Sequence, residues 1–298
     1  MRAGAWPLHC QALLAASVRA AAGQFPGRGQ HASERVHDVR KTLKEARAIA
    51  RLFLSSLGEP ARVTIAALAA TRRRVGRARD LDVIEQRLQR LAPPSEIAKP
   101  LSAAVERDRA AALGAHASFA ATASRAQLNA IAKRVEAWDL GHVGEDDIVE
   151  AAARTYAQAL RRGRLAFRGD DPAALHALRS RVVDLRYQLS ALSPAWPAAL
   201  NAQAEALNAL RDTLGAFNDF TVLATFAAER GGLTPEALEL LRAQLQAKQK
   251  KLRRRAETEF GRLFAEAPDA FAGRLAAYLK HPLEKPALAA KKEGTTDR

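Results

Sequence analysis

Hydrophobic residues recur every three or four positions along most of this chain, in segments separated by short runs rich in glycine and proline. That period is typical of amphipathic helices, whereas a half-buried strand alternates at every second residue. β-Branched and aromatic residues are sparse, and the breaks include DLGHVG, RGDDP and RGGLTP, which suit short connections between helices. The pattern predicts an all-α protein.

The segment that begins near residue 36 has two very different faces. At about 100° per residue, one side of a helix collects its apolar positions, which are Val36, Val39, Leu43, Ala46, Ala50, Phe53 and Leu57. An arc of roughly 120° on the other side carries His37, Arg40, Lys41, Lys44, Arg47 and Arg51. Like charges on adjacent turns repel one another by a few tenths of a kcal/mol per pair, so a bound anion would explain this face.

A second segment shows the same design with less charge. Its apolar stripe consists of Leu175, Leu178, Val182, Leu185, Leu189 and Leu192. His176, Arg179 and Arg186 occupy the places of His37, Arg40 and Arg47, while Ser180, Val183 and Ser190 replace Lys41, Lys44 and Arg51. We therefore expect the second basic face to bind an anion more weakly than the first.

The two segments belong to a longer internal repeat. Asp80 follows His37 at the same interval at which Asp219 follows His176, and LAATRRRVGRARD (68–80) aligns with LNALRDTLGAFND (207–219). In the same register Ser95 aligns with Thr234, and both are good N-caps for a helix. The repeat predicts two pseudo-symmetric helical bundles, with halves at residues 1–140 and 145–282 and a disordered tail at 283–298.

The charge balance indicates a polyanionic partner. The chain has 47 lysines and arginines against 32 acidic residues, a formal net charge of +15. Such an excess suits nucleic acid, an anionic membrane surface or a phosphate polymer. No apolar run approaches the roughly 20 residues of a membrane span. The single cysteine, Cys10, excludes an intramolecular disulfide and a thiolate metal cage, and is compatible with a reducing cytoplasm.

The N-terminal segment has two interpretations. MRAGAWPLHCQALLAASVRAAAG has an early arginine, an apolar stretch and small residues, as a signal peptide would. Arg19 interrupts the apolar run, however, and the segment occupies the place of the helix that precedes His176 in the second half. We favour a helix of the folded protein.

Further cations are candidates for the same anion. Arg77 and Arg79 lead into Asp80, and Lys248, Lys251 and Arg255 share one side of a later helix through KQKKLRRR. Other charge runs, such as Arg72 to Arg74, are more typical of a solvated face.

Aspartates and histidines also allow catalytic interpretations. Asp80 and Asp219 each follow a glycine, where we expect them to cap helix starts rather than act as bases. His37-Asp38 resembles the metal-binding pair of His-Asp phosphohydrolases, but the second copy has no aspartate there and the other histidines lack ligand spacing. We therefore expect no catalytic residues, metal or cofactor. Each histidine could donate to phosphate, be held by a loop carbonyl or by the aspartate of its repeat, or do both through its two ring nitrogens.

Taken together, these motifs resemble the CHAD family (conserved histidine α-helical domain). The matching elements are the two His-x-x-Arg helices, RDLDV at 79–83 and LGAFND at 214–219, within residues 8 to 280. The resemblance implies two bundles packed around a basic central groove or channel, binding of inorganic polyphosphate and association with polyphosphate granules. Glu45, Val183 and Asp184 depart from the family pattern, which has basic or neutral residues at Glu45 and Asp184.

The residues themselves also favour polyphosphate. A phosphate chain needs many cations and no stacking surface, whereas binders of single-stranded nucleic acid interleave aromatic rings with their charges. Aromatic residues are only 5% of the chain, and the basic faces contain none except Tyr187. We expect weaker binding of nucleic acid, with duplex DNA still open. The chain has no Glu-x-Glu-x-Lys motif of the triphosphate-tunnel domain that accompanies many relatives, so we expect a stand-alone binding module.

Overall fold

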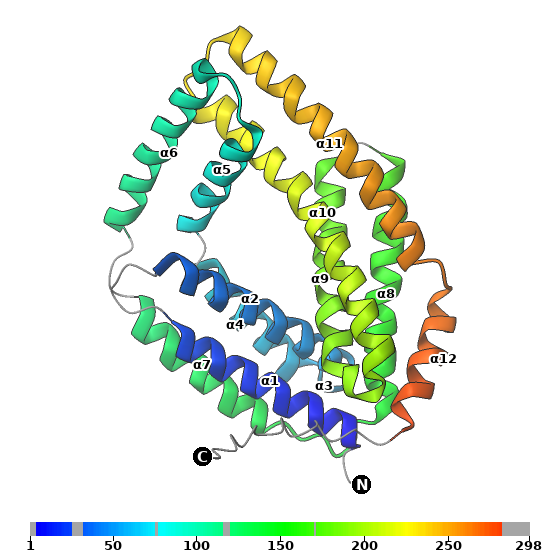
Figure 1. Ribbon diagram of the computed structural model, residues 1–298. Helices are drawn as coiled ribbons and strands as arrows, with labels where there is room; N and C mark the ends of the chain where they lie inside the picture. Colours follow the sequence, from blue (N-terminus) through cyan, green and yellow to red (C-terminus); the bar gives the residue numbers. More distant parts are fainter. Residues whose placement is uncertain (1–3, 26–31, 75–76, 116–119, 170, 282–298) are drawn as a thin grey trace, which may run out of the picture.

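The computed structural model describes residues 4–25, 32–74, 77–115, 120–169 and 171–281, and this part of the chain consists of helices and short connections, with no strand (Figure 1). The all-α prediction is therefore confirmed. Three groups of helices can be distinguished. Two single-turn 3₁₀ helices, η1 (Arg51–Phe53) and η2 (Ser193–Ala195), and the short α3 (Leu54–Leu57) complete the described elements.

The first two groups lie at the bottom and the right of Figure 1 and meet where α2 crosses α9. The first group contains α1 (Ala5–Gln24), α2 (Ala32–Ala50), α4 (Glu59–Arg74) and α7 (Ala120–Glu136). The second contains α8 (Glu145–Arg168), α9 (Pro172–Leu192), α10 (Pro197–Arg230) and α12 (Pro268–Leu279). Apolar faces of both groups contribute to one continuous hydrophobic core.

The third group forms the upper part of Figure 1 around a second core. It combines α5 (Arg77–Leu91) and α6 (Ser95–Ala115) with the C-terminal part of α10 and with α11 (Pro235–Leu263). Leu88, Leu101, Leu223 and Leu241 are buried between these helices. Both cores thus combine residues from before and after position 140, and the division into two pseudo-symmetric halves remains a prediction.

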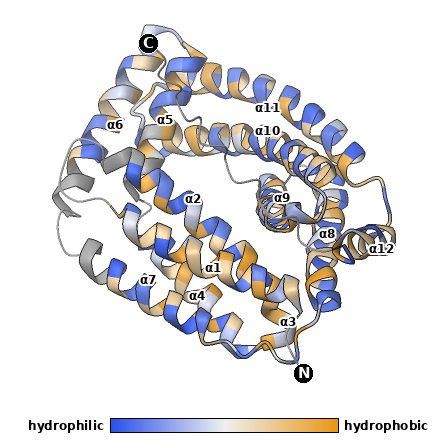
Figure 2. Cartoon of the chain, turned by 60° about the horizontal axis from the view of Figure 1, so that its bottom comes forward, coloured by the Kyte–Doolittle hydropathy of each residue, from blue (hydrophilic) through white to orange (hydrophobic). Residues whose placement is uncertain are grey.

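Figure 2 shows hydrophobic residues gathered where helices meet and hydrophilic residues on the outer faces. The N-terminal segment forms α1 and is packed into the first core, as the helical interpretation predicted. Its Trp6 donates a hydrogen bond from Nε1 to the carbonyl of Leu279, at 2.9 Å, which joins α1 to α12. No helix in the described part of the chain is long and apolar enough to cross a membrane.

The predicted helix starts near Ser95 and Thr234 are confirmed. α6 begins at Ser95, and the hydroxyl of Thr234 accepts a hydrogen bond from the amide of Ala237 at the start of α11, at 3.2 Å. Thr234 is thus the N-cap of α11, next to Pro235, whereas Ser95 is itself the first residue of α6, directly after Pro94.

The prediction that Asp219 caps a helix start is wrong. Asp219 lies in the interior of α10, which continues unbroken through Gly215. A glycine costs a helix only about 1 kcal/mol, so packing on both sides can carry the helix through it. Arg87 of α5 instead donates to Asp219 from Nη2 at 2.7 Å and from Nε at 3.0 Å. The side chain of Asp80 lies outside the described part of the structure.

A close helix approach allows a test of the packing. A Cβ on Gly163 of α8 would stand 2.1 Å from the ring of Phe260 on α11, and Phe260 is itself stacked on Phe264. Gly163→Ala should therefore lower the free energy of unfolding by about 1–3 kcal/mol, measured by chemical denaturation. Gly261→Ala is the matched control, because nothing lies within 4 Å of that position. It should leave stability unchanged or increase it, and equal losses in both variants would contradict the packing described here.

Candidate functional site

The site is built on the crossing of α2 over α9. The two helices come close together here because the small side chain of Ala48 on α2 packs against Val183 and Tyr187 of α9 in a small buried cluster. Gln188 donates from Nε2 to the carbonyl of Ala48 at 3.1 Å, and this bond is buried. The crossing fixes the basic face of α2 relative to α9.

A buried carboxylate lies at one end of the crossing. Asp184 of α9 is 0% exposed. One of its oxygens lies 3.3 Å from Nε of Arg51, which follows α2, and 3.2 Å from Nη2 of Arg181 on α9. Asp184 also raises the pKa of Arg47, although burial has the larger effect and lowers it. One negative charge therefore holds several positive charges in place where the helices meet.

Farther along α2, cations accumulate around Lys44. The pKa of Lys44 falls from 10.5 to about 7, first because the amine is buried and then because Arg179, Arg72, Arg40 and Arg211 repel its charge. These arginines come from α9, α4, α2 and α10, so four helices aim positive side chains at one region. We call Arg40, Lys44, Arg47, Arg72, Arg179 and Arg211 the basic cluster.

The basic cluster has unused hydrogen-bonding capacity. Burial lowers the pKa of Arg72, and Arg40, Arg73 and Arg179 lower it further. Within the described residues, the Nε atoms of Arg47, Arg72 and Arg211 are buried and have no hydrogen-bond partner. Buried donors of this kind cost stability until an acceptor reaches them. Guanidinium groups suit the oxygens of phosphate because their donors form a planar fork.

Gly215 brings the second half of the chain into the cluster. A Cβ at this position of α10 would stand 3.3 Å from Nε and 3.4 Å from Nη2 of Arg179. The absence of a side chain lets the guanidinium lie against the α10 backbone. The glycine of the LGAFND motif thus serves close approach within a helix, and not a break between helices.

A pocket of about 550 Å³ lies beside the cluster between α2, α9 and α10. It shares Arg211 with the cluster. Its lining also includes Lys41, Arg186, Ser190, Asn201, Ala204, Glu205 and Asn208. Positive charge therefore extends from the cluster into a space open to a ligand.

Comparison with known proteins agrees with this arrangement. The family model described as the CHAD domain matches residues 12–228, which is more than half of the chain. The chain belongs to the CHAD family. The crystal structure of the CHAD domain from the plant Ricinus communis is similar, with a TM-score of 0.59 and 21% identity over 93% of this chain and 94% of that one. This likeness shows the CHAD fold, and a search of curated proteins found no match.

The structure brings together part of the basic face predicted for this CHAD domain. Arg40, Lys44 and Arg47 of α2 meet Arg179 of α9 in the cluster, while Lys41 and Arg186 line the adjacent pocket. Arg51 is at the edge of the site, where it pairs with Asp184.

The candidates on α11 are not among the residues whose charge shifts the pKa of Lys44. α11 packs against α10, and Lys248, Lys251 and Arg255 are exposed on it. Arg255 pairs with Glu259 of its own helix, Nε to Oε1 at 2.7 Å. The side chains of Arg77 and Arg79, on α5, lie outside the described part of the structure.

The two family histidines are exposed at the edge of the site. His176 Nδ1 lies 3.0 Å from Oδ1 of Asn218, so its partner is the asparagine next to the aspartate that we expected. His37 is one turn of α2 before the cluster. The described residues contain no group of three or more histidine, cysteine or acidic side chains suited to a metal.

Sequence reasoning missed Arg72 and Arg211 as site residues. In the register of the predicted repeat they occupy equivalent places, just as Arg40 and Arg179 do. The four arginines around Lys44 therefore form two pairs at equivalent positions of the predicted repeat. Comparing the two repeat copies position by position would have pointed to Arg72 and Arg211. Asp184, a departure from the family pattern, is buried between Arg51 of the first basic face and Arg181 of α9.

The role of Asp184 can be tested through stability. Asp184→Asn removes the buried negative charge between Arg51 and Arg181, so chemical denaturation should show a loss of about 3 kcal/mol. Asp212→Asn is the control, because Asp212 pairs with Arg211 but its side chain is 60% exposed. That change should cost no more than about 0.5 kcal/mol. Similar effects of both changes would show that burial does not make Asp184 special.

Proposed function

We propose that this CHAD protein binds inorganic polyphosphate in the basic cluster, without hydrolysing it. The observation that carries the proposal is the environment of Lys44, where arginines from four helices surround one amine. Gathering these charges opposes folding, because each is partly removed from water and repelled by the others. A polyanion would offset both costs, since its oxygens supply negative charge and hydrogen-bond acceptors together.

The chemistry of the surroundings favours a phosphate polymer over nucleic acid. Tyr187, the aromatic residue of the predicted basic faces, is only 6% exposed. The guanidinium of Arg186 covers its ring at 3.8 Å from the centroid, and its hydroxyl lies 3.4 Å from the carbonyl of Lys41. It therefore offers no free ring for stacking a base, which is how single-stranded nucleic acid is usually held.

The direct test is competition. Long-chain polyphosphate should displace fluorescently labelled RNA and duplex DNA from the protein at physiological salt. At the same concentration of phosphate groups, polyphosphate should compete more strongly than unlabelled RNA or DNA. Affinity should fall steeply with salt, by analogy with counterion release from nucleic acid. Replacing Arg40, Lys44 and Arg72 with glutamine should weaken polyphosphate binding by at least about tenfold, because each lost charge-assisted bond is worth more than 1 kcal/mol.

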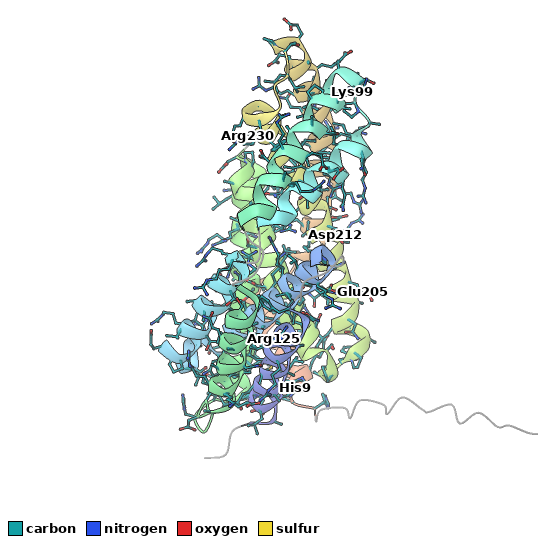
Figure 3. All side chains as sticks on the ribbon, turned by 90° about the vertical axis from the view of Figure 1, so that its left-hand side faces the viewer. His9, Lys99, Arg125, Glu205, Asp212 and Arg230 are labelled. Atoms are coloured by element: carbon teal, nitrogen blue, oxygen red, sulfur yellow. The ribbon has the colours of Figure 1, made fainter. Side chains whose placement is uncertain are left out.

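The control has to separate contact from overall charge. Replacing Lys99, Lys133 and Arg230 with glutamine removes the same formal charge from exposed positions, and Figure 3 places Lys99 and Arg230 toward one end of the molecule. This variant should bind polyphosphate nearly as wild type does. Equal losses in the two variants would mean that only the general field matters. Equal displacement by RNA and polyphosphate would support a general nucleic-acid binder instead.

The lowered pKa of Lys44 predicts that the affinity for polyphosphate depends on pH. In the free protein its pKa is about 7, and a bound polyanion should raise that pKa because it favours the charged amine. Above pH 7, binding must then take up a proton, so affinity should fall between pH 7 and 9, by at most about tenfold per unit. Below pH 7 the amine is already charged in both states and contributes no slope.

The comparison is isothermal titration of wild type and Lys44→Arg at several pH values. Arginine stays charged throughout, so the variant should lose the slope above pH 7 and keep its affinity. His37 and His176 are present in both proteins and their contribution cancels. Parallel profiles for the two proteins would remove Lys44 from the site.

A further inference from the structure

The pocket between α2, α9 and α10 has a lining that a phosphate polymer alone does not explain. Its volume of about 550 Å³ lies in the range of small-molecule sites. All but one of its lining residues are polar, the exception being Ala204. Three of them are cations, and four offer other hydrogen-bonding groups. The cations are Lys41, Arg186 and Arg211, and the others are the hydroxyl of Ser190, the carboxamides of Asn201 and Asn208 and the carboxylate of Glu205.

The pairing of α9 with α10 places these groups in order along the pocket. The chain turns back between the two helices at η2, and Arg179 of α9 lies against Gly215 of α10. Ser190 and Asn201 therefore lie near the turn. Arg211 lies ten residues after Asn201, which is about 15 Å along α10 and closer to the basic cluster. The pocket is thus cationic toward the cluster, whereas its end near the turn has no cation in the lining.

Glu205 is the lining residue least suited to polyphosphate. It is exposed and forms no ion pair with any described residue, although it shares the pocket with three cations. Arg211 pairs instead with Asp212, Nη2 to Oδ1 at 2.7 Å, and the guanidinium of Arg186 lies over the ring of Tyr187. A carboxylate accepts hydrogen bonds and repels phosphate oxygens. A ligand that uses the whole pocket therefore needs a group that donates hydrogen bonds as well as an anionic group.

We propose that this pocket binds small phosphate esters of sugars or other polyols. The phosphate lies among Lys41, Arg186 and Arg211, and the hydroxyl groups point toward the turn. There Glu205 accepts hydrogen bonds from hydroxyls, and the carboxamide of Asn201 both donates and accepts them. The described lining residues include no aromatic ring, so a nucleotide base would gain no stacking. This inference goes beyond polyphosphate binding and does not rest on it.

The test is isothermal titration of the full chain with a panel of defined compounds. The esters are glucose 6-phosphate, ribose 5-phosphate and mannitol 1-phosphate, and the references are inorganic phosphate and glucose. At least one ester should bind about tenfold more tightly than inorganic phosphate, because its hydroxyls add hydrogen bonds at the end near the turn. Glucose should show no measurable binding, because it lacks the charge that the cations hold. Mannitol 1-phosphate separates open-chain polyols from sugars.

Glu205→Gln separates hydroxyl recognition from simple attraction of anions. It should weaken binding of the preferred ester at least about threefold, because charge-assisted hydrogen bonds are lost. It should leave the affinity for inorganic phosphate unchanged or raise it, because a repelling charge is removed. The matched control is Glu229→Gln, which removes the same charge from an exposed position about 36 Å farther along α10. The control should change neither affinity, and both variants are checked for native melting.

Either of two results would overturn the inference. One is that none of the three esters binds more tightly than inorganic phosphate, and the other is that Glu205→Gln strengthens ester and inorganic phosphate alike. Polyphosphate binding is measured separately, in the absence of esters, and should survive Glu205→Gln. A protein that binds polyphosphate but prefers no ester refutes only this inference, whereas ester preference without polyphosphate binding refutes only the proposed function.

Discussion

The main physical constraint on this structure is the burial of like charges at the crossing of α2 and α9, which the surrounding helices have to hold together against their repulsion. Guanidinium groups from four helices surround Lys44, and the carboxylate of Asp184 is 0% exposed between Arg51 and Arg181. Asp184 offsets the repulsion at one end of the crossing. The other end has no comparable carboxylate among the causes that shift the pKa of Lys44. The excess positive potential is therefore concentrated where a ligand can reach it.

The gathered cations lower the stability of the fold because they repel one another, but the same charges would favour the binding of an anion. The hydrophobic cores on either side hold the helices in place and keep the cations together despite their repulsion. Cations that are held together in advance lose little conformational freedom when an anion binds, which strengthens binding. The same fixed positions lower the pKa of Lys44. The proposed anion binding and its expected pH dependence thus have a common physical origin.

Particular residues show how far sequence reasoning reached. The three- and four-residue period predicted the helices, and Thr234 marked the start of α11 through its capping hydroxyl. Gly215 was misleading because a glycine followed by an aspartate also suits a loop. In the structure Gly215 lies within α10 and makes room for Arg179. Local sequence patterns do not distinguish a glycine that ends a helix from one that admits a neighbour.

The sequence by itself determined the helical class and the basic face of α2, because these depend on spacing along the chain, and the repeat register remains a prediction of the same kind. Only the tertiary structure decided which cations share one space. Arg72 and Arg211 joined the cluster while Lys248, Lys251 and Arg255 remained exposed on α11. Burial and repulsion depend on distances between helices, so the low pKa of Lys44 and the partners of Asp184 follow from packing. A linear pattern of charges contains no such distances.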